Sequence, residues 1–89
     1  MPVYEVSYDL RQPRRNYEDL YTGLRRYTHC HALESVWLLD TAEDRVQIRD
    51  YLQQFMDRDD GILVTRLHGD WAAAGLSNNC MNWLAQRLP

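Results

Sequence analysis

The stretch EVSYDL, residues 5–10, belongs to an alternating pattern that begins at residue 3. Aromatic and β-branched side chains recur at every second position, which predicts a strand with one buried face. The pattern ends on a carboxylate, Asp9, and the loop RQPRRN follows directly. This loop carries three basic side chains, Arg11, Arg14 and Arg15. A carboxylate between a strand and a basic loop is the first candidate site in the chain.

Helix and strand patterns alternate through the rest of the chain. A helix is expected from Asn16, a good N-cap, to about residue 27, because its apolar side chains have the spacing of one buried face. The block HALESVWLLD, residues 31–40, is longer than a usual strand and can divide at Glu34–Ser35. The remaining expected elements are a helix at 42–57, a strand at 62–68 and a closing helix at 77–88.

This order of elements predicts a single α+β domain over residues 1–89. If the middle block divides, the chain reads β-α-β-β-α-β with an extra C-terminal helix, which is the order of a ferredoxin-like sandwich. If the block stays whole, a three-stranded α/β layer remains. We expect the ferredoxin-like arrangement.

Composition indicates a folded protein outside the membrane. The chain is 45% hydrophobic and has six Tyr and three Trp, which is enough for a packed core and argues against disorder. Tyr and Trp are also enriched at interfaces, so we expect an oligomer. No stretch approaches the roughly 20 apolar residues of a membrane span, and the N-terminal residues lack the pattern of a signal peptide.

Charge argues against a protein that holds nucleic acid by charge alone, since the net charge is −3. The charges are segregated: residues 10–29 hold five Arg against two acids, and residues 40–60 hold seven acids against three Arg. All ten basic residues are Arg. Arginine forks onto phosphate, which permits such a role, but a GC-rich genome is the better explanation of this usage.

The two cysteines, Cys30 and Cys80, lie far apart with no metal-binding spacing. We therefore expect free thiols and a cytoplasmic protein. The run His29-Cys30-His31 allows a zinc site with His68, although a plain loop leading into a strand explains it better. His68 is also a candidate general base near Asp9 or an ordinary surface histidine.

Two further patterns have a structural and a functional interpretation. Tyr17, Tyr21 and Tyr27 recur at helical spacing, which fits the core face of a helix better than a base-stacking surface. The acidic run DRDD at residues 57–60 lacks the spacing of a calcium loop and is expected to be a solvated turn.

Three motifs together resemble a known family: YDL at 8–10, a P-x-x-NY helix start from Pro13, and ESVW at 34–37. Over about residues 3–68 the chain is similar to the CRISPR-associated Cas-two family and to the related virulence-associated protein D family. It looks most like small Cas-two-like proteins found outside CRISPR settings. The resemblance implies a dimeric ferredoxin-like protein, with nuclease activity in some members and a structural role beside an integrase in others.

The resemblance also implies roles for individual residues. Asp9 matches the family's proposed metal ligand, and a dimer would place two copies close enough to share Mg²⁺ or Mn²⁺. Ser35 matches the family serine, which would hydrogen-bond a phosphate or a metal-bound water. The basic loop matches one that would hold a nucleic-acid backbone, through Arg11, Arg14 and Arg15. Without the family, Asp9 is better explained as a cap for the loop that follows than as a metal ligand; with it, the two explanations stand level.

Two functions therefore compete. The first is a metal-dependent endonuclease that acts on RNA or DNA as a homodimer through paired Asp9. The second is a non-catalytic dimeric module that binds or scaffolds a partner protein or duplex nucleic acid in a mobile-element, CRISPR-like or toxin–antitoxin system.

Overall fold

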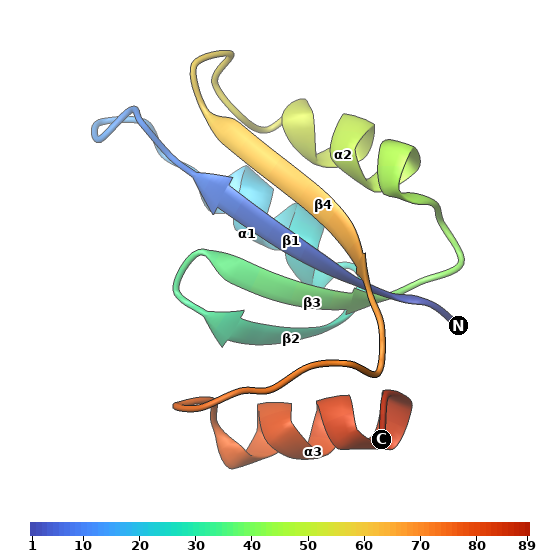
Figure 1. The fold of residues 1–89 in the computed structure, drawn as a ribbon. Helices are drawn as coiled ribbons and strands as arrows, with labels where there is room; N and C mark the ends of the chain where they lie inside the picture. Colours follow the sequence, from blue (N-terminus) through green and yellow to red (C-terminus); the bar gives the residue numbers. More distant parts are fainter.

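The computed structural model describes all residues from 1 to 89 and contains one antiparallel sheet. In chain order its elements are β1 (Val3–Asp9), α1 (Glu18–Arg25), β2 (Thr28–Leu33), β3 (Val36–Asp40), α2 (Arg45–Gln53), β4 (Gly61–Leu67) and α3 (Asn78–Arg87). The strands lie in the order β2-β3-β1-β4, and every neighbouring pair is antiparallel (Figure 1). An α+β fold with a C-terminal helix is therefore confirmed.

The middle block divides as its sequence allows. Glu34 and Ser35 form the tight turn between β2 and β3. β2 begins at Thr28, three residues before the expected block, so His29, Cys30 and His31 lie in a strand and not in a loop. The strand extends this far because it pairs with β3 along its length, with Thr28 opposite Asp40 and Cys30 opposite Leu38.

A side-chain cap sets the start of α2 but not of α1. The expected N-cap role of Asn16 is wrong by one residue, because α1 begins at Glu18 with Tyr17 at its N-cap position and has no side-chain cap there. The Asn16 side chain lies just before the cap and accepts a hydrogen bond of 2.9 Å from the backbone N–H of Glu18. α2 begins at Arg45, later than expected, because Asp44 and Gln47 form a reciprocal capping box there. The chain before Asp44 is therefore a connector and not a first helical turn.

One face of the sheet, the first face, is closed by α1 and α2. Its core joins aromatic and aliphatic side chains from β1 and β3 to both helices, including Tyr17 and Tyr27, with Tyr21 packed against it. The Tyr stripe is therefore part of the core, as expected. α1 lies close to α2 and to the turn after it at Gly23, where an added Cβ would lie 3.4 Å from the Tyr51 ring of α2 and 3.0 Å from the Phe55 ring that follows this helix.

The opposite face, the second face, is closed only in part by α3 and the connector of residues 68–77. Figure 1 shows α3 running along the β2 side of the sheet, away from α1 and α2. A smaller core lies between α3 and the strands, made of Val3, Cys30, Leu38, Cys80 and Leu84. Trp71 closes this region further, since its indole N–H donates to the Leu88 carbonyl at 2.8 Å.

The expectation of free thiols is wrong, because Cys30 of β2 and Cys80 of α3 form a disulfide. Their Cα atoms lie 5.6 Å apart, although 50 residues separate them in the sequence. The bridge forms because α3 folds back over β2, a pairing that no local spacing reveals. A cytoplasmic location thus loses the support that free thiols would give it.

No helix of the chain combines the length and the apolar character that a membrane crossing requires.

Candidate functional site

Asp9 ends β1 with an accessible carboxylate. Its side chain is 70% exposed and accepts a hydrogen bond of 3.0 Å from the Arg11 guanidinium, which forms an ion pair with it. Directly across the sheet, Asp9 pairs with Gly61, the first residue of β4. The carboxylate therefore lies on the surface, where solvent or a second molecule can reach it.

Arg11 ties the basic loop to the acidic loop before β4. Its backbone N–H donates to Asp60 Oδ1 at 2.7 Å, and its guanidinium donates to the Asp59 carbonyl at 2.9 Å. Gly61 leaves room for this side chain, because a Cβ there would lie 3.2 Å from Arg11 Nη2. Arg11 is thus held in place by three separate groups.

Asp60 organises the acidic loop. Its second oxygen accepts hydrogen bonds from the Tyr17 hydroxyl at 2.7 Å and from the backbone N–H of Asp57 at 2.9 Å. Burial raises the pKa of Asp60, but the bonds from Arg11, Tyr17 and Asp57 outweigh it and hold that pKa below its ordinary value. Residues 58 and 59 form the exposed turn expected from the sequence, but Asp57 and Asp60 on either side are half-buried and dock this turn against the basic loop.

The other two arginines of the basic loop differ from each other. Arg15 lies 3.8 Å from the Asp57 carboxylate and 5.7 Å from the centre of the Tyr17 ring. Arg14 is exposed and takes part in none of the ion pairs or side-chain hydrogen bonds of the chain. Arg14 is accordingly the loop residue with its guanidinium free for an external anion.

Ser35 lies at the same end of the sheet as Asp9. Its carbonyl accepts a hydrogen bond of 3.1 Å from the backbone N–H of Tyr8, and its side chain is exposed in the turn. The Tyr8 hydroxyl fixes this turn by donating to the Glu34 carbonyl at 3.2 Å, and it accepts from the Trp37 indole at 3.0 Å. The fold thus brings together one end of β1, the Ser35 turn and the basic loop.

His68 does not join this site. It follows β4 at the end where Leu67 pairs with Val3, whereas Asp9 pairs with Gly61 at the other end. A strand of this length separates them by about 20 Å, so His68 is not a general base for Asp9 in the same chain.

No metal cluster exists within one chain, since no three His, Cys, Asp or Glu side chains are grouped to hold an ion. Cys30 is engaged in the disulfide, which removes the thiolate that a zinc site at residues 29–31 would need. Asp9 supplies one carboxylate beside a guanidinium, so a single copy does not fit a Mg²⁺ site by itself.

The docking of loop 57–60 against loop 11–15 is the feature that sequence reasoning missed. The available signal was the opposite charge of the two segments, which face each other once β1 and β4 pair.

No protein-family model matches the chain, and no solved structure matches it at the significance applied.

Proposed function

We propose that the domain is ferredoxin-like and of the Cas-two-like kind. β1 and β2 run in the same direction with β3 between them, and β3 and β4 run in the same direction with β1 between them. These relations are those of two interleaved β-α-β units. The sequence resemblance at residues 3–68 covers the same six elements.

For the function, we propose a homodimeric endonuclease that acts on the phosphodiesters of RNA or DNA. The observation that carries this proposal is the convergence of exposed Asp9, the exposed Ser35 turn and the unpaired Arg14 at one end of the sheet. A carboxylate buried and locked by its own loop would have argued against the idea, but the Asp9 carboxylate is largely exposed.

A second copy is needed to complete the site, because one chain offers one carboxylate. Asp9 borders a shallow depression that also includes Ser7, Gly61 and Leu63, and the Leu63 side chain is 59% exposed. Contact with another copy at this end of the sheet would cover the exposed Leu63. Two Asp9 carboxylates related by a twofold axis would then face each other.

The roles of the residues follow from their positions. Mg²⁺ or Mn²⁺ bound by the paired Asp9 carboxylates would supply an activated water and polarise the phosphodiester. Arg14 would hold a backbone phosphate with its fork of N–H donors, and the Ser35 hydroxyl would hydrogen-bond a phosphate oxygen. Arg11 would have to release the Asp9 oxygen or share it with the ion.

A non-catalytic dimeric binding module is the second candidate. It is favoured by the internal neutralisation of charge at this site, where Arg11 pairs with Asp9 and Arg15 lies near Asp57. Because these charged side chains already pair with each other in the free protein, they need no metal to neutralise them. The pairing also holds this surface in a fixed geometry. Such a module would dock a partner protein or a duplex without cleaving it.

A cleavage assay separates the two candidates. Labelled single-stranded RNA and duplex DNA are incubated with wild type and Asp9→Asn, each with Mg²⁺, Mn²⁺ or chelator. Asp50→Asn is the matched control, since Asp50 is 60% exposed and pairs with Arg49 at 2.9 Å in the same way. The nuclease predicts metal-dependent cleavage that Asp9→Asn abolishes and Asp50→Asn retains. Cleavage that survives in Asp9→Asn, or no cleavage by wild type, would reject it.

A further inference from the structure

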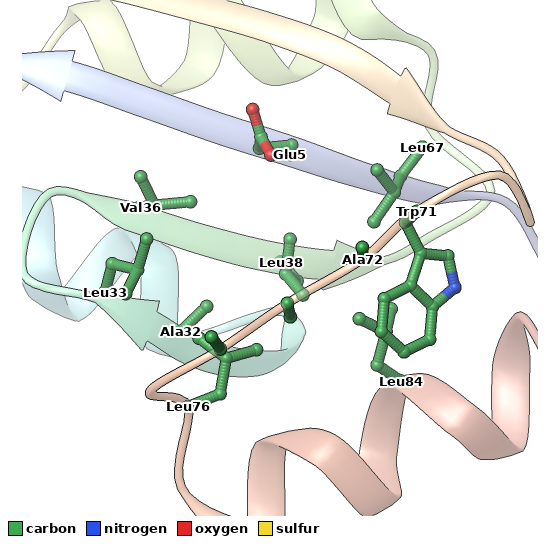
Figure 2. A pocket seen from close by; sticks show the side chains of 12 residues that line it. Glu5, Ala32, Leu33, Val36, Leu38, Leu67, Trp71, Ala72, Leu76 and Leu84 are labelled. Atoms are coloured by element: carbon green, nitrogen blue, oxygen red, sulfur yellow. The ribbon is translucent and has the colours of Figure 1, made fainter.

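An apolar pocket lies between the second face of the sheet and the C-terminal segment. Its volume is about 310 Å³, which is at the small end of the range for ligand pockets. Eleven of its twelve lining residues are apolar and come from β2, β3, β4, the connector and α3. Figure 2 shows Glu5 at the β1 side of this pocket and Leu76 and Leu84 at the α3 side.

The pocket exists because the connector crosses it with small side chains. Ala72, Ala73 and Ala74 contribute only methyl groups to its lining and are exposed, so the pocket is open to solvent on this side. Trp71 and Leu84 wall the side nearest α3, and the Trp71 indole is anchored to the Leu88 carbonyl. The disulfide between β2 and α3 fastens the same segment to the sheet.

Glu5 is the single charged residue of the lining, and it has no cation as a partner in the chain. Its neighbours across the sheet are Leu38 and Thr65, neither of which is basic. One carboxylate oxygen accepts a long hydrogen bond of 3.4 Å from the Ser7 hydroxyl, and the other oxygen accepts none. Glu5 is half-exposed, so water still reaches its carboxylate, and a cation that enters the pocket would find this carboxylate unpaired.

We propose that this pocket binds a small organic cation, an amine with an aromatic or aliphatic body. The body would occupy the space between Leu38, Trp71 and Leu84, and the ammonium group would pair with Glu5. Charge complementarity selects this class: a neutral apolar ligand leaves Glu5 without a partner, and a carboxylic acid is repelled by it. The site is separate from Asp9 and does not depend on the proposed nuclease.

Three probes of nearly equal shape test the proposal: 2-phenylethylamine, 2-phenylethanol and 3-phenylpropionate. Each is titrated into the full chain with the disulfide intact, and binding is followed by two-dimensional NMR through shifts of residues 5, 38 and 71–74. We expect the amine to bind about fivefold more tightly than the alcohol, with the acid weakest, and added salt to narrow both differences while the affinity of the alcohol stays the same. Equal affinity of amine and acid, or no binding of any probe, would overturn the proposal.

Variants locate the site. Glu5→Gln should abolish the advantage of the amine over the alcohol, whereas Glu18→Gln, an exposed change on α1, should leave it intact. Ala73→Trp should weaken both ligands by filling the pocket. Retained binding of the alcohol by Glu5→Gln verifies that this variant is folded. Equal affinity of the amine for Glu5→Gln and wild type would contradict the pairing of its ammonium group with Glu5. Equal affinity for Ala73→Trp and wild type would contradict binding in this pocket.

Discussion

The two faces of the sheet are closed by different means. The first face is sealed by α1 and α2 over a continuous core in which Val6, Leu39 and Leu52 are fully buried. The second face has a smaller core, and its cover depends on a disulfide, on the ion pair between Arg87 and Asp40, and on one tryptophan anchor. Apolar packing holds α1 and α2 on the first face. On the second face, α3 and its connector are held by these few individual interactions, and a pocket remains beneath them.

The largest effect is expected from the first face. Leu39→Ala removes a side chain with no exposed area, so we expect a loss of about 4 kcal/mol in the free energy of unfolding. Val46→Ala is the control, because Val46 is an exposed residue of α2, and this change should cost less than about 0.5 kcal/mol. Urea denaturation measures both. Similar losses in the two variants would contradict a sealed core on the first face.

The disulfide should give the next largest effect. Replacing Cys30 and Cys80 together by Ser frees a loop of 50 residues in the unfolded chain, which should cost about 3 kcal/mol. The loss should be local as well as global, because the bridge fastens only α3 and its connector. Hydrogen exchange should therefore accelerate most in α3. Equal acceleration of hydrogen exchange in α1, α2 and α3 would show that the helices on the two faces are not held separately.

The ion pair between Arg87 and Asp40 contributes less. Its atoms lie 2.7 Å apart with side chains 24% and 15% exposed, and the other Asp40 oxygen is buried without a partner. Asp40→Asn should lower the free energy of unfolding by about 1.5 kcal/mol, after allowing for partial exposure. Asp50→Asn breaks an exposed pair and should change it by less than about 0.5 kcal/mol. Equal effects in thermal denaturation would refute a special role for the buried pair.

The smallest effect concerns pH and the loop of Asp60. Because its pKa is lowered from 3.8 in the folded protein, its stabilising contribution is present above that value and is lost as the pH falls through the folded pKa. Asp60→Asn should be less stable than wild type by about 1 kcal/mol at neutral pH, and the difference should vanish in acid. Asp59→Asn, whose carboxylate makes no hydrogen bond, is the control. A difference that persists below the folded pKa would contradict this assignment.

The difference between local and long-range contacts explains which features the sequence could predict. The alternation in β1 and the turn at Glu34–Ser35 are local signals, and the structure confirms both. Asn16 lies one residue before the N-cap position of α1, so this local signal marked the helix start to within one residue. The Cys30–Cys80 bridge depends on where α3 folds back, which no neighbouring residue encodes.

At the candidate site, the sequence marked Asp9, Ser35 and the arginine loop, which the fold brings to one end of the sheet. It did not indicate that Asp60 would hold Arg11 and Tyr17. That arrangement requires β1 and β4 to pair, a contact between segments about fifty residues apart.

Mn²⁺ binding tests the central claim, a metal site shared by Asp9 from two copies, most directly. Mn²⁺ is titrated into the protein while NMR line broadening and sedimentation are recorded for wild type, Asp9→Asn and Asp50→Asn. The account predicts a dimer in which one ion per two chains broadens the signals of Asp9 and Gly61, with no such broadening in Asp9→Asn and full broadening in Asp50→Asn. A monomer that Mn²⁺ leaves unchanged, or equal broadening in Asp9→Asn, would contradict it.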